Sequence, residues 1–290
     1  LASGTGWKTL NVTSYVQEEW GGDKVVSFRL LPNYANGGTW PGQLFYDHEA
    51  GAYVYLAITY TTLPAAPSGC TSHYVATNNA KCTWNDNSNN ETGFRIEKAI
   101  DGAGFSFWKN VGANVKDSGT YTLGANHRIK FQVRAYNAAG SSGWSISGYT
   151  YTTPAAPTGI TAHYDATDKS HCTWSDQSAY ESGFDVDYRI NGGSWVNYQT
   201  TGANAQTSSI YTVGANKYIE WRVRSYRGSL YSSFIYSGIV YTTPSPPSGC
   251  TAHYSAPNAY ATWADNSAYE TGFRVEYSYN SGGSWELLEN

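Results

Sequence analysis

The sequence has no methionine, little charge and no long apolar run. Charged residues make up 14% of the chain, the net charge is −4, and the 18 lysines and arginines are scattered. No surface for nucleic acid or an anionic membrane is therefore expected. No apolar stretch approaches the roughly 20 residues of a membrane-spanning helix, and the N-terminus lacks a basic and apolar signal segment. The absence of methionine and a start at Leu1 that reads as mid-domain favour a piece of a larger protein.

Helical periodicity is missing as well, because no long stretch repeats its apolar residues every 3.6 positions. The chain is instead rich in aromatic residues, at 16%, and has 30 glycines with abundant serine and threonine. These side chains suit half-buried, pleated surfaces joined by tight turns. The composition predicts an all-β fold.

A unit of 90 residues organises the chain. The proline cluster that begins at Pro64 returns at Pro154 and Pro244, and both intervals are 90 residues (154 − 64 and 244 − 154). The same landmarks follow each cluster in phase: Gly69, Gly159 and Gly249; His73, His163 and His253; Trp84, Trp174 and Trp263; Phe94, Phe184 and Phe273. A repeat of this length is a domain and not a turn of a solenoid.

Within the first unit, apolar and polar residues alternate with a period of two, as in strands with one buried face. The residues expected to face inward are Cys82 and Trp84, then Phe94 and Ile96, then Ile129, Phe131, Val133 and Ala135. Clusters of Asn, Asp, Ser and Gly separate these runs and predict turns. Several short strands at regular spacing indicate a β-sandwich.

The unit resembles a bacterial or archaeal fibronectin type III domain. The resemblance rests on four features: the Pro-x-x-Pro-x-Gly motif at the start of the unit, the core Trp84 of the second strand, the segment Asp86–Glu97 and the strand Phe131–Asn137. It implies complete repeats at residues 63–153 and 154–243 and a partial repeat at residues 244–290. Ile129 and Ile219 occupy the position of the family's corner tyrosine, so apolar packing is expected to replace that tether, or the tether is absent.

Residues 1–62 differ from the repeat and also read as strands. Their order of Trp7, Val12-Thr13, Val16, Trp20 and two apolar strands resembles the C-terminal half of the jelly-roll-like DNRLRE, or disaggregatase-related, family. That resemblance implies a domain of secreted surface proteins and carbohydrate-active enzymes, some of which bind polysaccharide. Trp40, Phe45 and Tyr46 form an aromatic loop here and are the candidate glycan contacts.

The cysteines pose the sharpest chemical question. Cys70 and Cys82 fall on inward positions of neighbouring strands, where a disulfide is geometrically possible. The equivalent pairs are Ile160 with Cys172 and Cys250 with Ala261, so a small buried hydrophobe also suits these positions. Cys70 and Cys82 are thus either a disulfide or buried thiols, and Cys172 and Cys250 are predicted to be buried thiols.

Other reactive-looking residues have ordinary structural explanations. The three recurring histidines lie a domain length apart and cannot share a metal ion. Asp86, Ser88 and Glu91 fit a turn better than a calcium cage. Trp108, Trp195 and Trp285 follow Gly/Ser-rich turns and are expected to cover an edge of each sandwich. Asn11 and Asn90 match the N-glycosylation pattern.

No nucleophile motif, phosphate loop or zinc spacing is present, so neither an enzyme nor a cofactor is predicted. The leading hypothesis is a structural or adhesive extracellular protein, a modular rod in a surface layer, sheath or filament, because the short proline-rich junctions are stiff. Its partners would be copies of itself or other surface proteins, and possibly polysaccharide. The alternatives are a carbohydrate-binding accessory region of a secreted polysaccharide-degrading enzyme and a surface module of a phage or similar particle.

Overall fold

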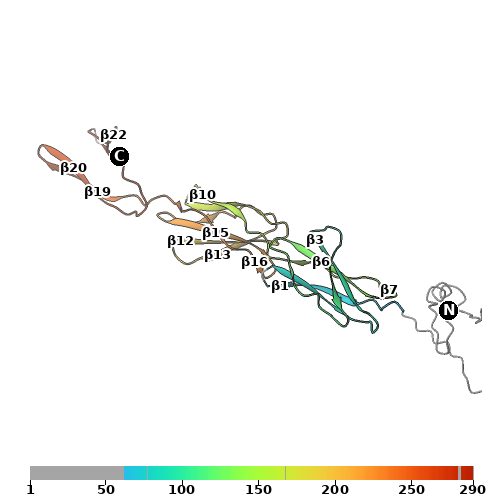
Figure 1. The fold of residues 1–290 in the computed structure, drawn as a ribbon. Helices are drawn as coiled ribbons and strands as arrows, with labels where there is room; N and C mark the ends of the chain where they lie inside the picture. The colour runs from blue at the N-terminus through green and yellow to red at the C-terminus, as the bar shows by residue number, and fades with distance from the viewer. Residues whose placement is uncertain (1–61, 77, 167, 280–281, 290) are drawn as a thin grey trace, which may run out of the picture. The chain divides into compact units, whose positions relative to one another are not determined.

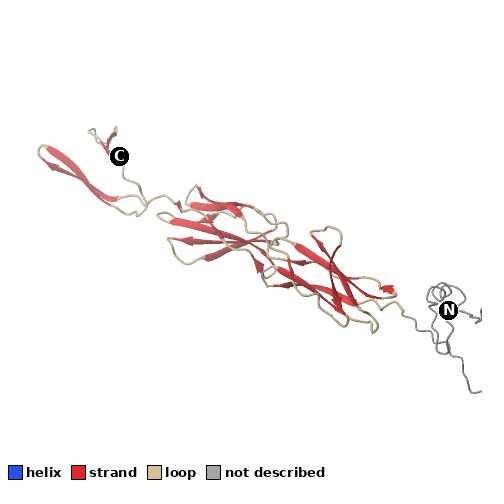
Figure 2. Ribbon diagram, in the orientation of Figure 1, coloured by secondary structure: helices blue, strands red, loops and turns tan. Residues whose placement is uncertain are grey.

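The computed structural model describes residues 62–290 apart from positions 77, 167, 280–281 and 290. The described residues form strands, turns and bends and contain no helix (Figures 1 and 2). The strands of the described residues repeat in three successive blocks within the unit Leu63–Asn290. The predicted all-β fold class is confirmed.

The first block, at residues 63–153, is a sandwich of two antiparallel sheets. Its strands are β1 (Ser68–Val75), β2 (Asn79–Asn85), β3 (Gly93–Ile100), β4 (Ser106–Gly112), β5 (Tyr121–Thr122), β6 (Arg128–Asn137), β7 (Gly140–Ser141), β8 (Ser145–Ile146) and β9 (Thr150–Tyr151). One sheet has the order β1-β2-β5, and the other has the order β4-β3-β6-β7, with β8 and β9 also paired to β6. The chain changes sheets between β2 and β3, and β5 returns to the first sheet before β6 joins the second, as in a Greek-key sandwich.

The second block, at residues 154–243, repeats this arrangement strand for strand. Its strands are β10 (Thr158–Asp165), β11 (Lys169–Ser175), β12 (Gly183–Ile190), β13 (Val196–Gly202), β14 (Tyr211–Thr212), β15 (Tyr218–Arg227), β16 (Leu230–Tyr231), β17 (Ile235–Tyr236) and β18 (Val240–Tyr241). The sheets have the orders β10-β11-β14 and β13-β12-β15-β16. The internal sequence repeat is therefore a repeat of whole domains.

A bulge near the start of each first strand explains the recurring glycine. The pairing register shifts between Ser68 and Thr71, and the same shift occurs in the second and third blocks. Gly69, Gly159 and Gly249 lie in these bulges with φ of 63°, 62° and 61°. Only glycine adopts this backbone conformation without a steric penalty, so the glycine fixes where each bulge forms.

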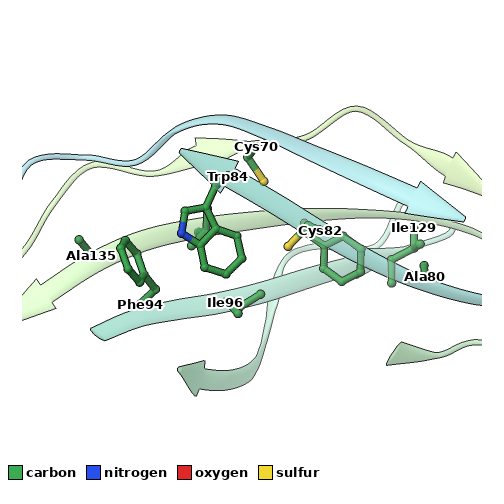
Figure 3. Packing of buried hydrophobic residues seen from close by; sticks show 10 residues of the cluster. Cys70, Ala80, Cys82, Trp84, Phe94, Ile96, Ile129 and Ala135 are labelled. Atoms are coloured by element: carbon green, nitrogen blue, oxygen red, sulfur yellow. The ribbon is translucent and has the colours of Figure 1, made fainter. Parts of the chain in front are cut away.

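The cores are filled as the alternation predicts. Every inward position predicted in the first block is buried, and Trp84 packs at a tilt on Phe94 with ring centroids 5.5 Å apart (Figure 3). Trp174 and Phe184 repeat this contact at 5.5 Å. Ile129 and Ile219 are fully buried, so apolar packing occupies the position of the corner tyrosine.

The last edge of each complete sandwich is interrupted, and hydroxyl groups replace part of the strand pairing. Ser142, Ser147 and Thr152 each accept a hydrogen bond from a backbone N–H at the β6 edge, at 3.0, 2.8 and 3.0 Å. Ser232, Ser237 and Thr242 do the same along β15, at 3.0, 2.9 and 3.0 Å. These hydroxyls satisfy backbone donors that the short edge strands leave unpaired.

The third block, at residues 244–290, has two separate hairpins. They are formed by β19 (Ser248–Ser255) with β20 (Asn258–Ala264) and by β21 (Val275–Tyr277) with β22 (Glu286–Glu289). Trp263 is 36% exposed, whereas its equivalents Trp84 and Trp174 are 4% and 3% exposed. Cys250 is exposed, so the prediction of a buried thiol is wrong there, because no opposite sheet covers this hairpin among the described residues.

Candidate functional site

Cys70 and Cys82 lie in the same core but not directly opposite each other. The register places Ser72 opposite Cys82, so Cys70 is two residues further along β1, on the diagonal. Both are free thiols in the structure (Figure 3). A hydrogen bond with the Cys70 thiol, and burial, raise the pKa of Cys82 far above its usual range. Cys82 is thus a poor nucleophile, and the disulfide stays a prediction.

Each recurring histidine makes a local cross-strand contact. The Nε2 atoms of His73, His163 and His253 lie 2.8, 2.9 and 3.0 Å from the hydroxyl of a threonine on the paired strand. This contact explains their recurrence without a ligand. No group of three His, Cys, Asp or Glu side chains in the described part of the chain could hold a metal ion.

Asp86 and Glu91 organise the turn between β2 and β3. The Ser88 N–H donates to the Asp86 carboxylate at 3.0 Å, and the Asn114 N–H donates to the Glu91 carboxylate at 3.1 Å. Backbone hydrogen bonds, first its own N–H and then that of Asn114, lower the pKa of Glu91. Asp176 and Glu181 make the same contacts in the second block, at 2.8 and 3.1 Å. Both pairs tie neighbouring loops together.

The three tryptophans predicted to cover sandwich edges do not share one role. Trp108 packs on the core, against Tyr121 and Phe131 at 5.2 and 5.7 Å. The equivalent residue in the second block is Tyr198, which contacts Tyr211 and Trp221 in the same way. Trp195 instead lies beside cations and Tyr236 on an outer sheet face, and Trp285 is 61% exposed. The edge-covering prediction is wrong for Trp195, because its 90-residue equivalent is Phe105 and not Trp108.

Asn90 is exposed in the loop before β3, and its side-chain oxygen accepts a hydrogen bond from Ser88 at 2.9 Å. Glycosylation at Asn90 stays a prediction. Asn11, the aromatic loop of Trp40, Phe45 and Tyr46, and the DNRLRE resemblance of residues 1–62 lie outside the described residues.

A single asparagine joins each block to the next. The Asn126 amide donates to the Gln177 carbonyl at 3.3 Å, and its oxygen accepts from the Ser178 hydroxyl at 2.9 Å and the Ala179 N–H at 3.0 Å. Asn126 has φ of 61°, a left-handed conformation that asparagine tolerates better than most residues. The side chain therefore bonds both a backbone carbonyl and a turn of the following domain.

The second junction repeats the first. The Asn216 amide donates to the Asn266 carbonyl at 3.1 Å, and its oxygen accepts from the Ser267 hydroxyl at 2.8 Å and the Ala268 N–H at 3.4 Å. Its φ is 56°. We call Asn126 and Asn216 the junction asparagines. The recurring Gly-Ala-Asn at 124–126 and 214–216 is visible in the sequence, where it predicts a turn and not a contact with the next domain.

Aromatic residues pack beside each junction asparagine. At the first junction Tyr151 contacts Tyr180 with ring centroids 5.9 Å apart, and the Arg227 guanidinium lies 3.5 Å from the Tyr151 ring centre. At the second junction Tyr241 contacts Tyr269 at 5.6 Å. Burial, and then the nearby Asp101 carboxylate, raise the pKa of Tyr180. Each junction thus combines three hydrogen bonds with an aromatic contact.

The outer face of the β12–β15 sheet carries a charge-balanced row of arginines. Arg222 and Arg224 pair with Asp187 and Asp185 at 2.7 and 3.0 Å, and Arg189 pairs with Glu220. Aromatic rings separate the cations: Arg222 lies 4.7 Å from Trp195 and 4.0 Å from Phe234, and Arg224 lies 4.0 Å from Tyr231. Each arginine of this row therefore has its own carboxylate.

The equivalent face of the first block has more cations than carboxylates. Lys130 lies 5.1 Å from both Phe105 and Tyr149, Arg128 lies 4.5 Å from Tyr149, and Arg134 lies 4.4 Å from Trp144. Glu97 is the carboxylate in this row, and it bonds Arg95 and Gln132. Gln132 is buried on this face, although it alternates with the inward residues Phe131 and Val133 along β6. The two outer faces thus share a pattern but differ in charge.

Comparison with known proteins gives matches among solved structures alone. No family model and no curated protein matches the chain. A two-domain fibronectin type III segment of chicken tenascin is 13% identical with a TM-score of 0.38, over 61% of this chain and 99% of that one. The FN1–FN3 domains of chicken CNTN1 are 15% identical with a TM-score of 0.39, over 79% and 86%. The assignment of tandem sandwiches of the fibronectin type III kind rests on the strand order within each block.

Proposed function

We propose that this chain is a non-catalytic, extended segment of an extracellular structural or adhesive protein, in which successive sandwich domains are held at fixed junctions. The observation that supports the proposal most is the recurrence of the same three hydrogen bonds at Asn126 and Asn216, 90 residues apart. A protein that merely tethers domains needs a linker, whereas a spacer that transmits force or sets distance needs defined joints.

Two constraints act on each joint: the prolines of the connecting segment and the hydrogen bonds of the junction asparagine. Proline clusters begin at Pro154 and Pro244, directly after the edge strands β9 and β18, and proline restricts the backbone of the connecting segment. The junction asparagine then bonds both a carbonyl and an N–H of the next domain. Rotation of one domain would break all three hydrogen bonds together, so the joint favours one orientation.

The side chains of the described domains support a mechanical role. The recurring histidines, the turn carboxylates and the buried thiols each have a local structural contact, as described above. Sandwich domains of this architecture are frequent in cell-surface proteins. Among the residues that the structure describes, no helix could cross a membrane.

Small-angle X-ray scattering of the whole chain tests the proposal. Replacing Asn126 and Asn216 by glycine removes the side chains while keeping a residue that accepts their positive φ. The double variant should lose the defined inter-domain distances of the parent and scatter as a flexible set of domains. The matched control is Asn114→Gly with Asn204→Gly, since these asparagines have φ of 60° and 61° but lie in loops within a domain. Equal flexibility of parent and junction variant would contradict the proposal.

A further inference from the structure

One charge reversal distinguishes the outer faces of the two complete sandwiches. Arg95 and Arg134 are directly opposite each other on β3 and β6. The equivalent residues on β12 and β15 are Asp185 and Arg224, which form an ion pair with contacts of 3.0 and 3.1 Å. The first block therefore places two guanidinium groups where the second block places a guanidinium and a carboxylate.

Two like charges directly opposite each other in a sheet are unfavourable. Glu97 relieves this in part, because its Oε1 atom accepts from Arg95 Nε at 2.9 Å and lies 2.8 Å from Arg95 Nη2. The other Glu97 oxygen accepts from Gln132 at 2.7 Å. Glu97 thus neutralises Arg95, and it forms no ion pair with Arg134.

Arg134, like Arg128 and Lys130 of this row, is a cation without a carboxylate in the described part of the chain. It forms no ion pair with any residue that the structure describes, and its Nε atom is buried without a hydrogen-bond partner there. Trp144 holds the guanidinium in place from one side, at 4.4 Å. A buried donor left without a partner is costly, and the Nε atom of Arg128 on the same face is also without one among the described residues.

A pocket of about 260 Å³ lies beside Arg134. Its lining includes Arg95 and Arg134 together with Asn110, Tyr136, Asn137 and Ser141. The pocket is larger than a single carboxylate needs, and its other walls carry amide and hydroxyl groups. Such groups suit the hydroxyls of a sugar ring, whereas a guanidinium suits a planar carboxylate that accepts two parallel hydrogen bonds.

We propose that this pocket binds a uronic acid, with the sugar's carboxylate on Arg134 and Arg95 in the place that the Asp185 carboxylate takes in the second block. The ligand's carboxylate would complete the ion pair that the first block lacks. In the second block Asp185 already forms an ion pair with Arg224, so no equivalent binding site is expected there. The inference rests on this pocket and is independent of the proposed mechanical role.

Binding of D-galacturonate to the whole chain tests the proposal by NMR at low ionic strength, where charge interactions are least screened. Addition of galacturonate should shift the Arg134 Nε–H resonance saturably, and neutral D-galactose should not. The variant Arg95→Asp recreates the pair of the second block and should weaken binding about tenfold or more, as expected for lost charge-assisted hydrogen bonds. Arg274→Asp is the matched control, because Arg274 is the equivalent of Arg95 in the open third block.

Each other outcome overturns a stated part of the proposal. Equal binding of galactose, or unchanged affinity in Arg95→Asp, would exclude the carboxylate as the recognised group. Tighter binding of a glutamate-rich peptide than of oligogalacturonate would exclude the sugar. If circular dichroism shows that Arg95→Asp is unfolded, Arg134→Gln takes its place and should lose binding in the same way. No saturable shift of Arg134 in the parent chain would refute the site.

Discussion

At the residue scale, the Ser147 hydroxyl takes the place of a backbone carbonyl, because it accepts a hydrogen bond from the neighbouring strand β6. It accepts from the Phe131 N–H at 2.8 Å and donates to the Gly148 carbonyl at 2.9 Å, and both Ser147 and Phe131 are buried. The Ser147 hydroxyl is therefore the hydrogen-bond acceptor of the Phe131 N–H. A similar hydrogen bond recurs at Ser142, Thr152 and their equivalents.

Replacing Ser147 by alanine should lower the free energy of unfolding of the first domain by about 1–3 kcal/mol, the cost of a buried donor without a partner. Hydrogen exchange of the Phe131 amide in the whole chain measures the effect, and exchange should accelerate. Ser106→Ala is the control, since Ser106 is exposed and its hydroxyl makes only long contacts of 3.4 Å. Unchanged exchange at Phe131 would show that the hydroxyl is dispensable.

The burial of a side chain could be predicted from the sequence where it depends only on the alternation of apolar and polar residues. Trp84, Phe94 and the inward residues of β6 are buried as predicted, because period-two patterning fixes which face a strand buries. Trp195 was misassigned because it was aligned by its neighbouring turn and not by its distance of 90 residues from Phe105. The serine and threonine ladder was also missed, although Ser142 and Ser232 are 90 residues apart.

At the scale of elements, a glycine of β3 has no room for a side chain beside β4. A methyl group added at Gly93 would collide with the Val111 carbonyl oxygen and lie 2.9 Å from the Tyr136 hydroxyl. Gly183 faces the Thr201 carbonyl oxygen in the same way. Gly112 pairs with Gly93 across the sheet, yet it has open space around its missing side chain.

Gly93→Ala should therefore separate β3 from β4 and destabilise the first domain by about 1–3 kcal/mol, the usual cost of overpacking. Hydrogen exchange of the β4 amides should accelerate, and the apparent melting temperature should fall. Gly112→Ala should leave both nearly unchanged, because its methyl group meets nothing within 4 Å. Similar effects of the two substitutions would contradict the close-approach argument.

The elements themselves were predictable, but their chemistry on the outer faces was not. The Arg95 and Asp185 difference is visible in the sequence, yet its meaning depends on Arg134 and Arg224 lying opposite on β6 and β15. Register across a sheet is set by turns and bulges, which single-strand patterns do not specify. The pocket beside Arg134 therefore required the structure.

At the scale of the whole molecule, the third block behaves as an acceptor for a second half. Trp263 is partly exposed, and Leu287 and Leu288 are 52% and 65% exposed. In the complete blocks the tryptophans equivalent to Trp263 are buried, and Trp108 and Tyr198, the equivalents of Leu288, pack on the core. Exposed apolar surface of this kind is unfavourable in water.

Appending a copy of residues 201–243 after Asn290 should close the third block. Hydrogen exchange of the β20 amides should slow, and binding of a hydrophobic dye should fall, because the added strands cover the face around Trp263. A copy that carries Trp221→Asp is the control, since Trp221 is fully buried in its own domain. If both copies slow hydrogen exchange of the β20 amides equally, the added segment does not form a native-like core with the third block.

The 90-residue spacing is visible in the sequence, but the way the blocks are joined is not. The proline clusters indicated stiff connections, yet the junction asparagines bond residues about 50 positions away, on the next domain. A contact across a domain boundary leaves no periodic trace within either domain. Gly-Ala-Asn also occurs at 112–114 and 202–204, within the domains, so the motif alone does not identify the junction residue.

The junction geometry also bears on how such a chain can lengthen. Each complete block carries a junction asparagine near one end, and the block that follows it carries the Ser-containing turn that bonds this asparagine, so the two joints are equivalent. Duplication or loss of a 90-residue coding unit would leave every remaining joint complete. Length can thus change during evolution by whole steps without a compensating substitution elsewhere.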